Sequence, residues 1–120
     1  MRLFPVAAAL LCLAQPLSAQ DALSPDEEMR CALMALAASG QVEDAQQKSG
    51  LAAVATYWMG RYEARSGGTL EAWGTREALQ QTIAGAAALA PRCEAAARVI
   101  GQRIQAFGRQ IAALEEGDAR

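Results

Sequence analysis

The clearest pattern along the chain is a set of apolar residues near its C-terminus, spaced alternately four and three positions apart. Its members are Cys93, Ala97, Ile100, Ile104, Phe107, Ile111 and Leu114. This spacing places all seven side chains on one face of an amphipathic helix. We therefore predict a long helix whose apolar stripe is covered by the other helices of the fold. On this hypothesis, the substitution Ile104→Arg should unfold the domain, because it buries an unpaired cation.

Helix start and end signals divide the chain upstream of the stripe. Ser24-Pro25-Asp26-Glu27 provides an N-cap serine, a proline at the first helical position and a glutamate at the third, which is the capping-box arrangement. The first helix should end near Ser39-Gly40. Residues 69–74 are predicted to be a loop with a turn. A third helix is expected over 75–90, and a fourth from Pro91, because proline disfavours helical geometry in the residue before it.

A second helix is predicted between the first and the third. Asp44 can cap it, and it should run from about Ala45 to Ser66, ending at Gly67-Gly68. Gly50 and Gly60 lie inside this helix, and each costs about 1 kcal/mol relative to alanine. Each glycine therefore marks either a close approach of another helix or a break in the helix.

No segment alternates apolar and polar residues over a strand length, and alanine is the commonest residue. Both features favour an all-α fold. The short connections indicate that successive helices are antiparallel neighbours. We therefore predict a small four-helix bundle.

The first residues have the order of a secretory signal peptide. Arg2 is followed by an apolar run over 3–13 and then by small residues, so we predict a signal peptide over 1–19. The rest should form a single helical domain over 20–116 with a disordered tail over 117–120. This organisation predicts a periplasmic or secreted protein with no membrane association after cleavage, and it leaves the oligomeric state open.

Two cysteines, Cys31 and Cys93, remain after cleavage of the signal peptide. Thiols tend to oxidise outside the cytoplasm, so we predict one disulfide between the first and the fourth helix. Closing a loop of about sixty residues would stabilise the domain by roughly 4 kcal/mol on the chain-entropy model. The alternative is a pair of unpaired, buried thiols.

Charge and composition exclude several classes of function. The mature chain has ten basic and thirteen acidic residues, scattered rather than clustered, which gives no electrostatic footprint for nucleic acid. The chain has no histidine, which excludes Ser-His-Asp catalysis and histidine-ligated zinc or haem. We therefore expect neither an enzyme nor a protein that carries a metal or another cofactor.

Four aromatic residues are candidates for binding a protein partner: Tyr57, Trp58, Tyr62 and Trp73. Adjacent residues on a helix point in different directions, so Tyr57 and Trp58 cannot both face the same neighbour. An exposed tyrosine or tryptophan would suit an interface. The alternative places Trp58 and Tyr62 in the core with Tyr57 half-buried.

Two arginines of the second helix, Arg61 and Arg65, lie four residues apart. One interpretation is that they hold an anionic group, for instance a carboxylate. The other is that they form part of a solvated helix face.

The layout of the chain resembles the HdeA/HdeB group of periplasmic acid-stress chaperones. The features that carry this resemblance are a cysteine in the first helix, the segment Tyr57-Trp58-Met59-Gly60-Arg61-Tyr62 and a late cysteine. The layout also resembles small periplasmic immunity proteins. The first resemblance implies a stress-related, chaperone-like protein that exposes its apolar stripe to unfolded clients in acid. The alternative function is a passive interaction module, of the immunity or adaptor type, that recognises one specific protein partner at neutral pH.

Overall fold

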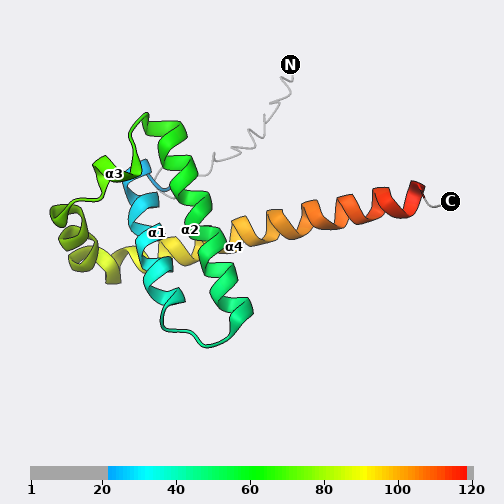
Figure 1. The fold of residues 1–120 in the computed structure, drawn as a ribbon, viewed down its shortest axis with the longest axis horizontal. Helices are drawn as coiled ribbons and strands as arrows, with labels where there is room; N and C mark the ends of the chain where they lie inside the picture. Colours follow the sequence, from blue (N-terminus) through cyan, green and yellow to red (C-terminus); the bar gives the residue numbers. More distant parts are fainter. Residues whose placement is uncertain (1–21, 119–120) are drawn as a thin grey trace, which may run out of the picture.

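The computed structural model describes residues 22–118, which form four helices and no strand (Figure 1). The helices are α1 (Pro25–Ser39), α2 (Ala45–Ser66), α3 (Leu70–Trp73) and α4 (Arg76–Asp118). The predicted all-α fold class is confirmed, as is a helical bundle joined by one disulfide. The predicted signal peptide, residues 1–19, lies outside the described residues.

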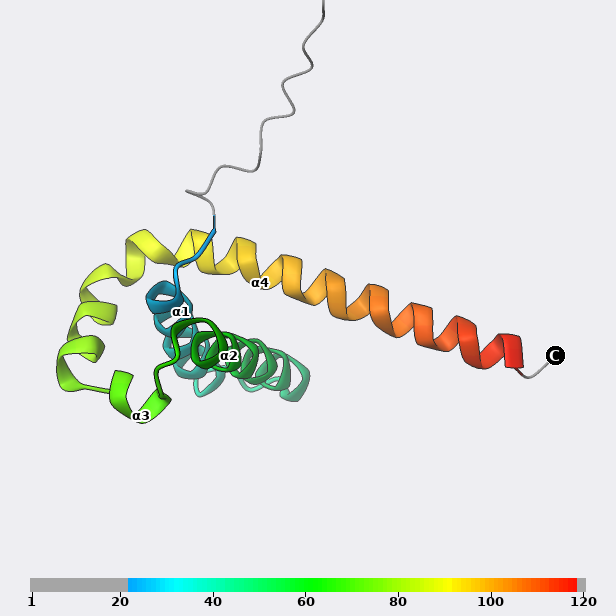
Figure 2. The same cartoon turned by 90° about the horizontal axis from the view of Figure 1, so that it is seen from above.

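α1 and α2 lie side by side as an antiparallel hairpin (Figures 1 and 2). α1 begins with the predicted capping box, in which the Ser24 hydroxyl accepts from the Glu27 N–H and a Glu27 carboxylate oxygen accepts from the Ser24 N–H, each at 3.1 Å. Asp44 caps α2 by accepting from the Gln47 N–H at 2.8 Å. α2 ends at Gly67, whose φ of +69° is the left-handed conformation expected of glycine past a helix end.

α2 is continuous across Gly50 and Gly60, so the predicted alternative of a break is wrong. The other alternative, a close approach of helices, is also wrong, because a Cβ added at either glycine would meet no atom within 4 Å. Both glycines lie on the exposed side of the helix. They therefore reduce helix stability without a packing role in the described fold.

Replacing Gly60 by alanine is expected to raise the free energy of unfolding by about 0.5–1 kcal/mol, because alanine loses less backbone entropy on folding. Urea denaturation with the disulfide intact measures the change. Gly67→Ala is the matched control, and its positive φ predicts a loss of stability instead. A destabilised Gly60→Ala variant would mean that this face of α2 is covered in the native protein.

α4 is one helix of 43 residues, so the predicted helix end before Pro91 is wrong. Pro91 lacks the N–H that would bond to the Ala87 carbonyl, but both residues are exposed and water can satisfy that oxygen. Figure 2, in which α1 is seen end-on, shows that the N-terminal part of α4 curves around α1 and that the rest of α4 runs straight. Helical geometry also continues through Gly117 and Asp118, whereas residues 119–120 lie outside the described part of the chain.

α3 is a single helical turn in the segment predicted to be a loop with a turn. The Thr69 hydroxyl caps it by accepting from the Ala72 N–H at 3.2 Å. The four helices of the structure therefore differ from the four predicted ones: α3 is short, and α4 takes the place of the predicted third and fourth helices.

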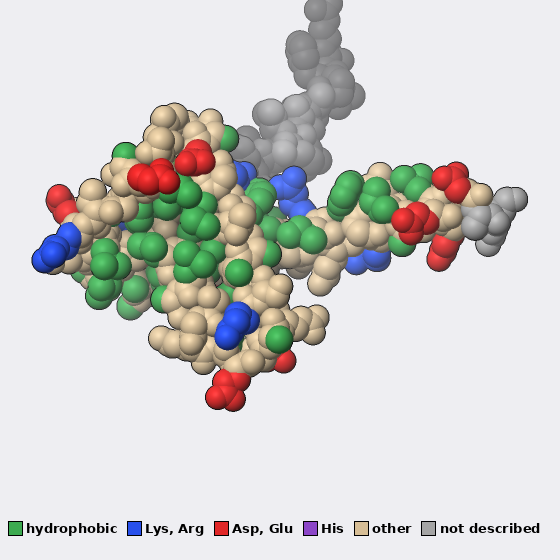
Figure 3. Space-filling model, in the orientation of Figure 1, with side chains coloured by type: hydrophobic (Ala, Val, Ile, Leu, Met, Phe, Trp, Pro, Cys, Tyr) green, Lys and Arg blue, Asp and Glu red, His purple; other side chains and the backbone are tan. Residues whose placement is uncertain are grey.

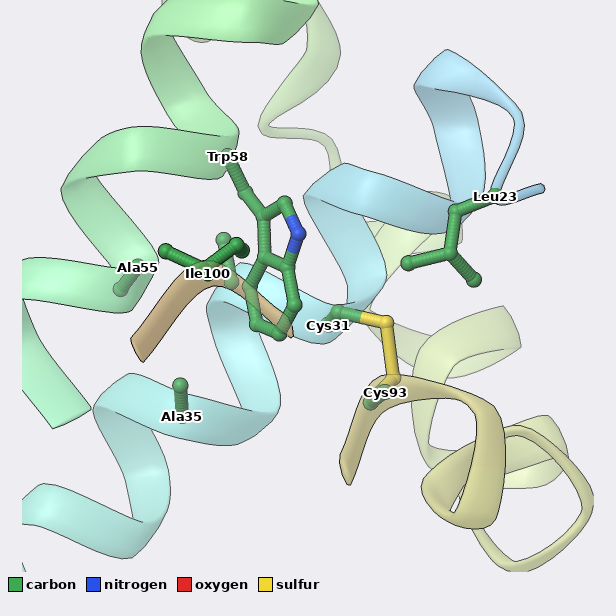
Figure 4. Close-up of a cluster of buried hydrophobic side chains, with 8 residues drawn as sticks. Leu23, Cys31, Ala35, Ala55, Trp58, Cys93 and Ile100 are labelled. Atoms are coloured by element: carbon green, nitrogen blue, oxygen red, sulfur yellow. A yellow bond between two sulfur atoms is a disulfide. The ribbon is translucent and has the colours of Figure 1, made fainter. Parts of the chain in front are cut away.

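The core is small and lies where α1, α2 and the middle of α4 meet, with Trp58 at its centre (Figure 4). The buried apolar residues of this cluster are Leu23, Cys31, Ala32, Ala35, Ala55, Trp58, Cys93 and Ile100. Most of them are small, which allows close packing of α1 against α2.

Residues 101–118 of α4 extend away from the bundle, and we call this segment the arm (Figure 1). Four large apolar side chains of the predicted stripe lie on the arm, and they are Ile104, Phe107, Ile111 and Leu114, which are 58%, 62%, 40% and 60% exposed. Only the first part of the stripe, Cys93 to Ile100, contributes to the core. The prediction that the other helices cover the whole stripe is therefore wrong beyond Ile100.

Candidate binding surface

The predicted disulfide is present and joins the middle of α1 to α4 (Figure 4). Cys31 and Cys93 are both buried, and their Cα atoms are 5.5 Å apart. The bond fixes α4 against α1 about two turns before the arm begins. The direction in which the arm leaves the bundle is therefore set by a covalent link as well as by packing.

A buried carboxylate on α1 interacts with two arginines of α2. Glu28 is 3% exposed, and its Oε1 accepts hydrogen bonds from Arg61 Nε at 2.9 Å and from Arg65 Nη1 at 2.7 Å. Arg61 also donates to the Tyr57 hydroxyl at 3.3 Å, and this bond raises the pKa of Arg61, helped by Glu28 and opposed by burial. The interpretation that the two arginines hold a carboxylate is confirmed, but that carboxylate belongs to the same chain and holds α1 against α2.

A second ion pair joins α4 to the N-terminus of α1. Arg92, next to the disulfide, donates to the Glu27 carboxylate and, at 3.3 Å, to the Ala22 carbonyl oxygen. Burial tends to raise the pKa of Glu27, but the hydrogen bonds from Ser24 and the interaction with Arg92 outweigh burial, so the pKa lies below its ordinary value of 4.5. Glu27 therefore contributes to stability in its ionised form.

The lowered pKa of Glu27 predicts a loss of stability in acid. A carboxyl whose pKa is lower in the folded state stabilises the fold fully above its unfolded pKa, and the contribution is lost as the pH falls through the folded pKa. Glu27→Gln keeps a capping side chain and removes the charge. We expect it to cost about 0.5–1 kcal/mol at pH 7, the range of partly exposed ion pairs, and progressively less as the pH falls through the folded pKa of Glu27. Urea denaturation at pH 7 and at pH 3 measures both values, and an equal cost at both would contradict the assignment.

The four aromatic residues predicted as candidates for binding a protein partner lie in three different environments. Trp58 is 3% exposed and belongs to the core, where it also contributes to the lining of an apolar groove. Tyr57 is half-buried and lines a hollow of about 300 Å³ at the base of the arm, together with Ile104 and Phe107. Tyr62 and Trp73 are half-buried and line a different hollow, where Trp73 Nε1 donates to the Asp26 carboxylate at 2.9 Å.

An apolar groove of about 610 Å³ opens between α1, α2 and α4 beside the base of the arm. Its lining is contributed by Cys31, Met34, Ala35, Ala38, Gly50, Leu51, Ala53, Val54, Trp58, Ala90, Cys93, Glu94, Ala97, Gly101, Ile104 and Gln105. Glu94 is the only charged residue in that lining. Because Ile104 also begins the exposed part of the stripe, the groove continues into the apolar face of the arm.

The apolar face of the arm, the groove and the Tyr57 hollow together form what we call the binding surface. Figure 3 shows hydrophobic side chains gathered on one face of the bundle and along the arm. The sequence indicated the stripe but gave no indication that it lies open. The sequence did not predict the groove, because the groove depends on how three separate helices cross.

Two searches of the described residues bear on what the binding surface can hold. Within residues 22–118, no three side chains of the histidine, cysteine, aspartate and glutamate types are placed to hold a metal ion. None of the helices in this range is long and apolar enough to cross a membrane. Because its groove is lined almost wholly by apolar residues, the binding surface offers a ligand apolar contact area. Comparisons with protein-family models, curated proteins and solved structures found no match to this chain.

Proposed function

We propose that this protein is an exported, non-catalytic interaction module that binds a polypeptide through the α4 arm and the adjoining groove. The observation that carries the proposal is the exposure of four large apolar side chains on one face of a helix that leaves the bundle. Contiguous apolar surface of this kind on a folded domain marks an interaction site. The predicted signal peptide and the disulfide support an oxidising compartment, either the periplasm or the exterior.

A polypeptide suits this surface better than a small molecule does. An exposed helix face with residues repeating every three and four positions matches the way an amphipathic helix docks on another helix. Small-molecule sites are concave and carry a few convergent polar groups that orient the ligand. The groove has only Glu94 and Gln105 as polar side chains on its α4 side.

A stress-related, chaperone-like role is the second candidate, and one specific feature favours it. α1 is held to α2 and α4 by carboxylate–arginine contacts, through Glu28 with Arg61 and Arg65 and through Glu27 with Arg92. Protonation of Glu27 would remove its ion pair with Arg92, weaken the attachment of α1 to α4 and widen the groove between them. Such a protein would bind unfolding clients in acid, whereas the interaction module binds at neutral pH.

The test replaces Phe107 by a photo-crosslinking phenylalanine analogue in the secreted, disulfide-bonded chain. Irradiation at pH 7 in the native extracytoplasmic compartment is expected to give a defined covalent adduct with a polypeptide. The control places the analogue at Ile83, which is 68% exposed on α4 but lies outside the binding surface. Identical adducts from both positions, or none from Phe107, would contradict the proposal. Adducts that form only in acid would favour the chaperone-like role.

A further inference from the structure

We propose that the arm pairs in antiparallel orientation with the arm of a second copy of this chain. The inference rests on the proposed function of the arm as a binding surface, and it names the occupant. It follows from three features of the arm: the spacing of its apolar residues, its charge distribution and the position of its base beside the groove.

The period of the stripe is that of a coiled coil. Spacings that alternate strictly between four and three residues average 3.5, so the seam stays aligned with a partner helix over its whole length. In heptad terms, Ile104 and Ile111 occupy a positions, and Phe107 and Leu114 occupy d positions. On the arm, only the a and d positions carry large apolar side chains, so the apolar seam is two residues wide in each heptad. The narrow seam therefore fits one partner helix.

Charge is divided along the arm and the turn before it. Residues 98–110 contain three arginines and no acidic residue, whereas residues 111–118 contain three acidic residues and no basic one. The six are Arg98, Arg103, Arg109, Glu115, Glu116 and Asp118. None of them forms an ion pair within the described chain. Figure 3 shows acidic side chains gathered near the tip.

This distribution makes the arm complementary to itself in one orientation only. An antiparallel partner places its acidic tip beside the basic base of this arm, and the reverse holds at the other end. A parallel partner would instead bring the two acidic tips together. The acidic residues at the C-terminus of α4 also oppose its helix dipole, so they gain from a basic neighbour on a second copy.

One register satisfies both the seam and the charges. Ile104 lies opposite Leu114 of the second copy, and Phe107 lies opposite its Ile111. The basic base of each arm then lies beside the acidic tip of the other. Leu114 of the second copy then lies opposite Ile104, which lines the groove, so the apolar contact of the two arms reaches the edge of the bundle. Gly101 and Gly108 flank the seam, and neither has a neighbour within 4 Å of an added Cβ, which leaves room for close approach.

A lipid surface suits the arm less well. Amphipathic helices that lie on membranes carry lysine and arginine along their polar face. Here the outer part of the arm is acidic, and anionic lipid headgroups would repel it. The paired length is about 27 Å, so the interface is short and we expect a Kd in the micromolar range, at the weak end of specific complexes.

Sedimentation equilibrium of the full secreted chain, from low micromolar to several hundred micromolar concentration, tests the proposal. The wild type should be a monomer–dimer mixture that dissociates in high salt. Phe107→Glu should weaken the dimer at least tenfold, and Ile83→Glu, the same change on another exposed part of α4, should not. Both positions are exposed, so neither variant should unfold.

Charge exchange tests the orientation. Arg103→Glu/Arg109→Glu and Glu115→Lys/Glu116→Lys should each weaken self-association, whereas the combination of all four substitutions should restore it. In a parallel dimer like charges would lie side by side in every member of the series, so neither double substitution would weaken self-association. Equal affinities across the series would therefore overturn the proposed orientation. A monomer at every concentration would overturn the second copy as occupant. In that case a Phe107 adduct with a different polypeptide would still support the proposed function. If Phe107 formed no adduct at all, both the self-pairing and the proposed function would be contradicted.

Discussion

Ile100→Arg is expected to unfold the bundle, whereas Ile104→Arg, one helical turn further along the same stripe, is expected to leave it folded. Ile100 is 7% exposed and packs in the cluster around Trp58. A guanidinium placed there has no acidic partner in that cluster, and burying an unpaired charge costs several kcal/mol. Ile104 is 58% exposed, so an arginine there can extend into water and should change stability by less than about 0.5 kcal/mol.

Thermal denaturation followed by circular dichroism, at low protein concentration and with the disulfide intact, measures both effects. Low concentration keeps self-association from contributing to the melt. Unfolding of both variants would mean that the bundle covers the arm in solution. A wild-type melt for Ile100→Arg would mean that the apolar cluster does not hold α4 in place.

The contrast between Ile100 and Ile104 shows what the spacing of apolar residues can predict and what it cannot. The spacing of the stripe correctly predicts a helix and identifies its apolar face, because both follow from local geometry. It does not reveal what covers that face. Figure 1 shows that α1 and α2 cross α4 and do not run along it, so the hairpin covers only the middle of this 43-residue helix. The strict 3.5-residue period fits the proposed pairing of the arm with a second copy.

Local signals predicted the bundle itself well. The capping box at Ser24, the cap at Asp44 and the glycine after α2 all form as expected, because each depends on residues within one turn. The predicted helix end before Pro91 is wrong, because contacts with other parts of the fold decide the geometry there. The preference against helical geometry before proline is weak, and contacts on both sides of Pro91 outweigh it, including the disulfide at Cys93.

The contact between Glu28 and the two arginines could be predicted only in part. The spacing of Arg61 and Arg65 indicated a pair able to hold an anion, but its partner lies 33 and 37 residues away on another helix. Glu28 follows Asp26 and Glu27 in the first turn of α1, where the helix dipole already accounts for acidic residues. Only the packing of α1 on α2 distinguishes the buried glutamate from its neighbours.

Replacing both cysteines, Cys31→Ala/Cys93→Ala, is expected to lower the free energy of unfolding by about 4 kcal/mol, through the added entropy of the unfolded chain. The two residues are separated by 62 positions, so the disulfide closes most of the domain into one loop. Small domains have total stabilities of roughly 5–15 kcal/mol, and this core consists of eight residues, several of them alanines. The loss should therefore leave the bundle only marginally folded.

Urea denaturation of the double variant, of the wild type and of the wild type under reducing conditions separates the effect of the cross-link from that of the side chains. The reduced wild type should lose nearly as much stability as the variant, because alanine in place of two small thiols removes little packing. α4 touches the hairpin chiefly around Cys93 and Ile100, so loss of the disulfide should release α4 before α1 and α2 separate. Hydrogen exchange should then show the largest loss of protection in residues 90–100. A variant with wild-type stability would mean that α4 is held by apolar packing alone, and that the direction of the arm does not depend on the covalent link.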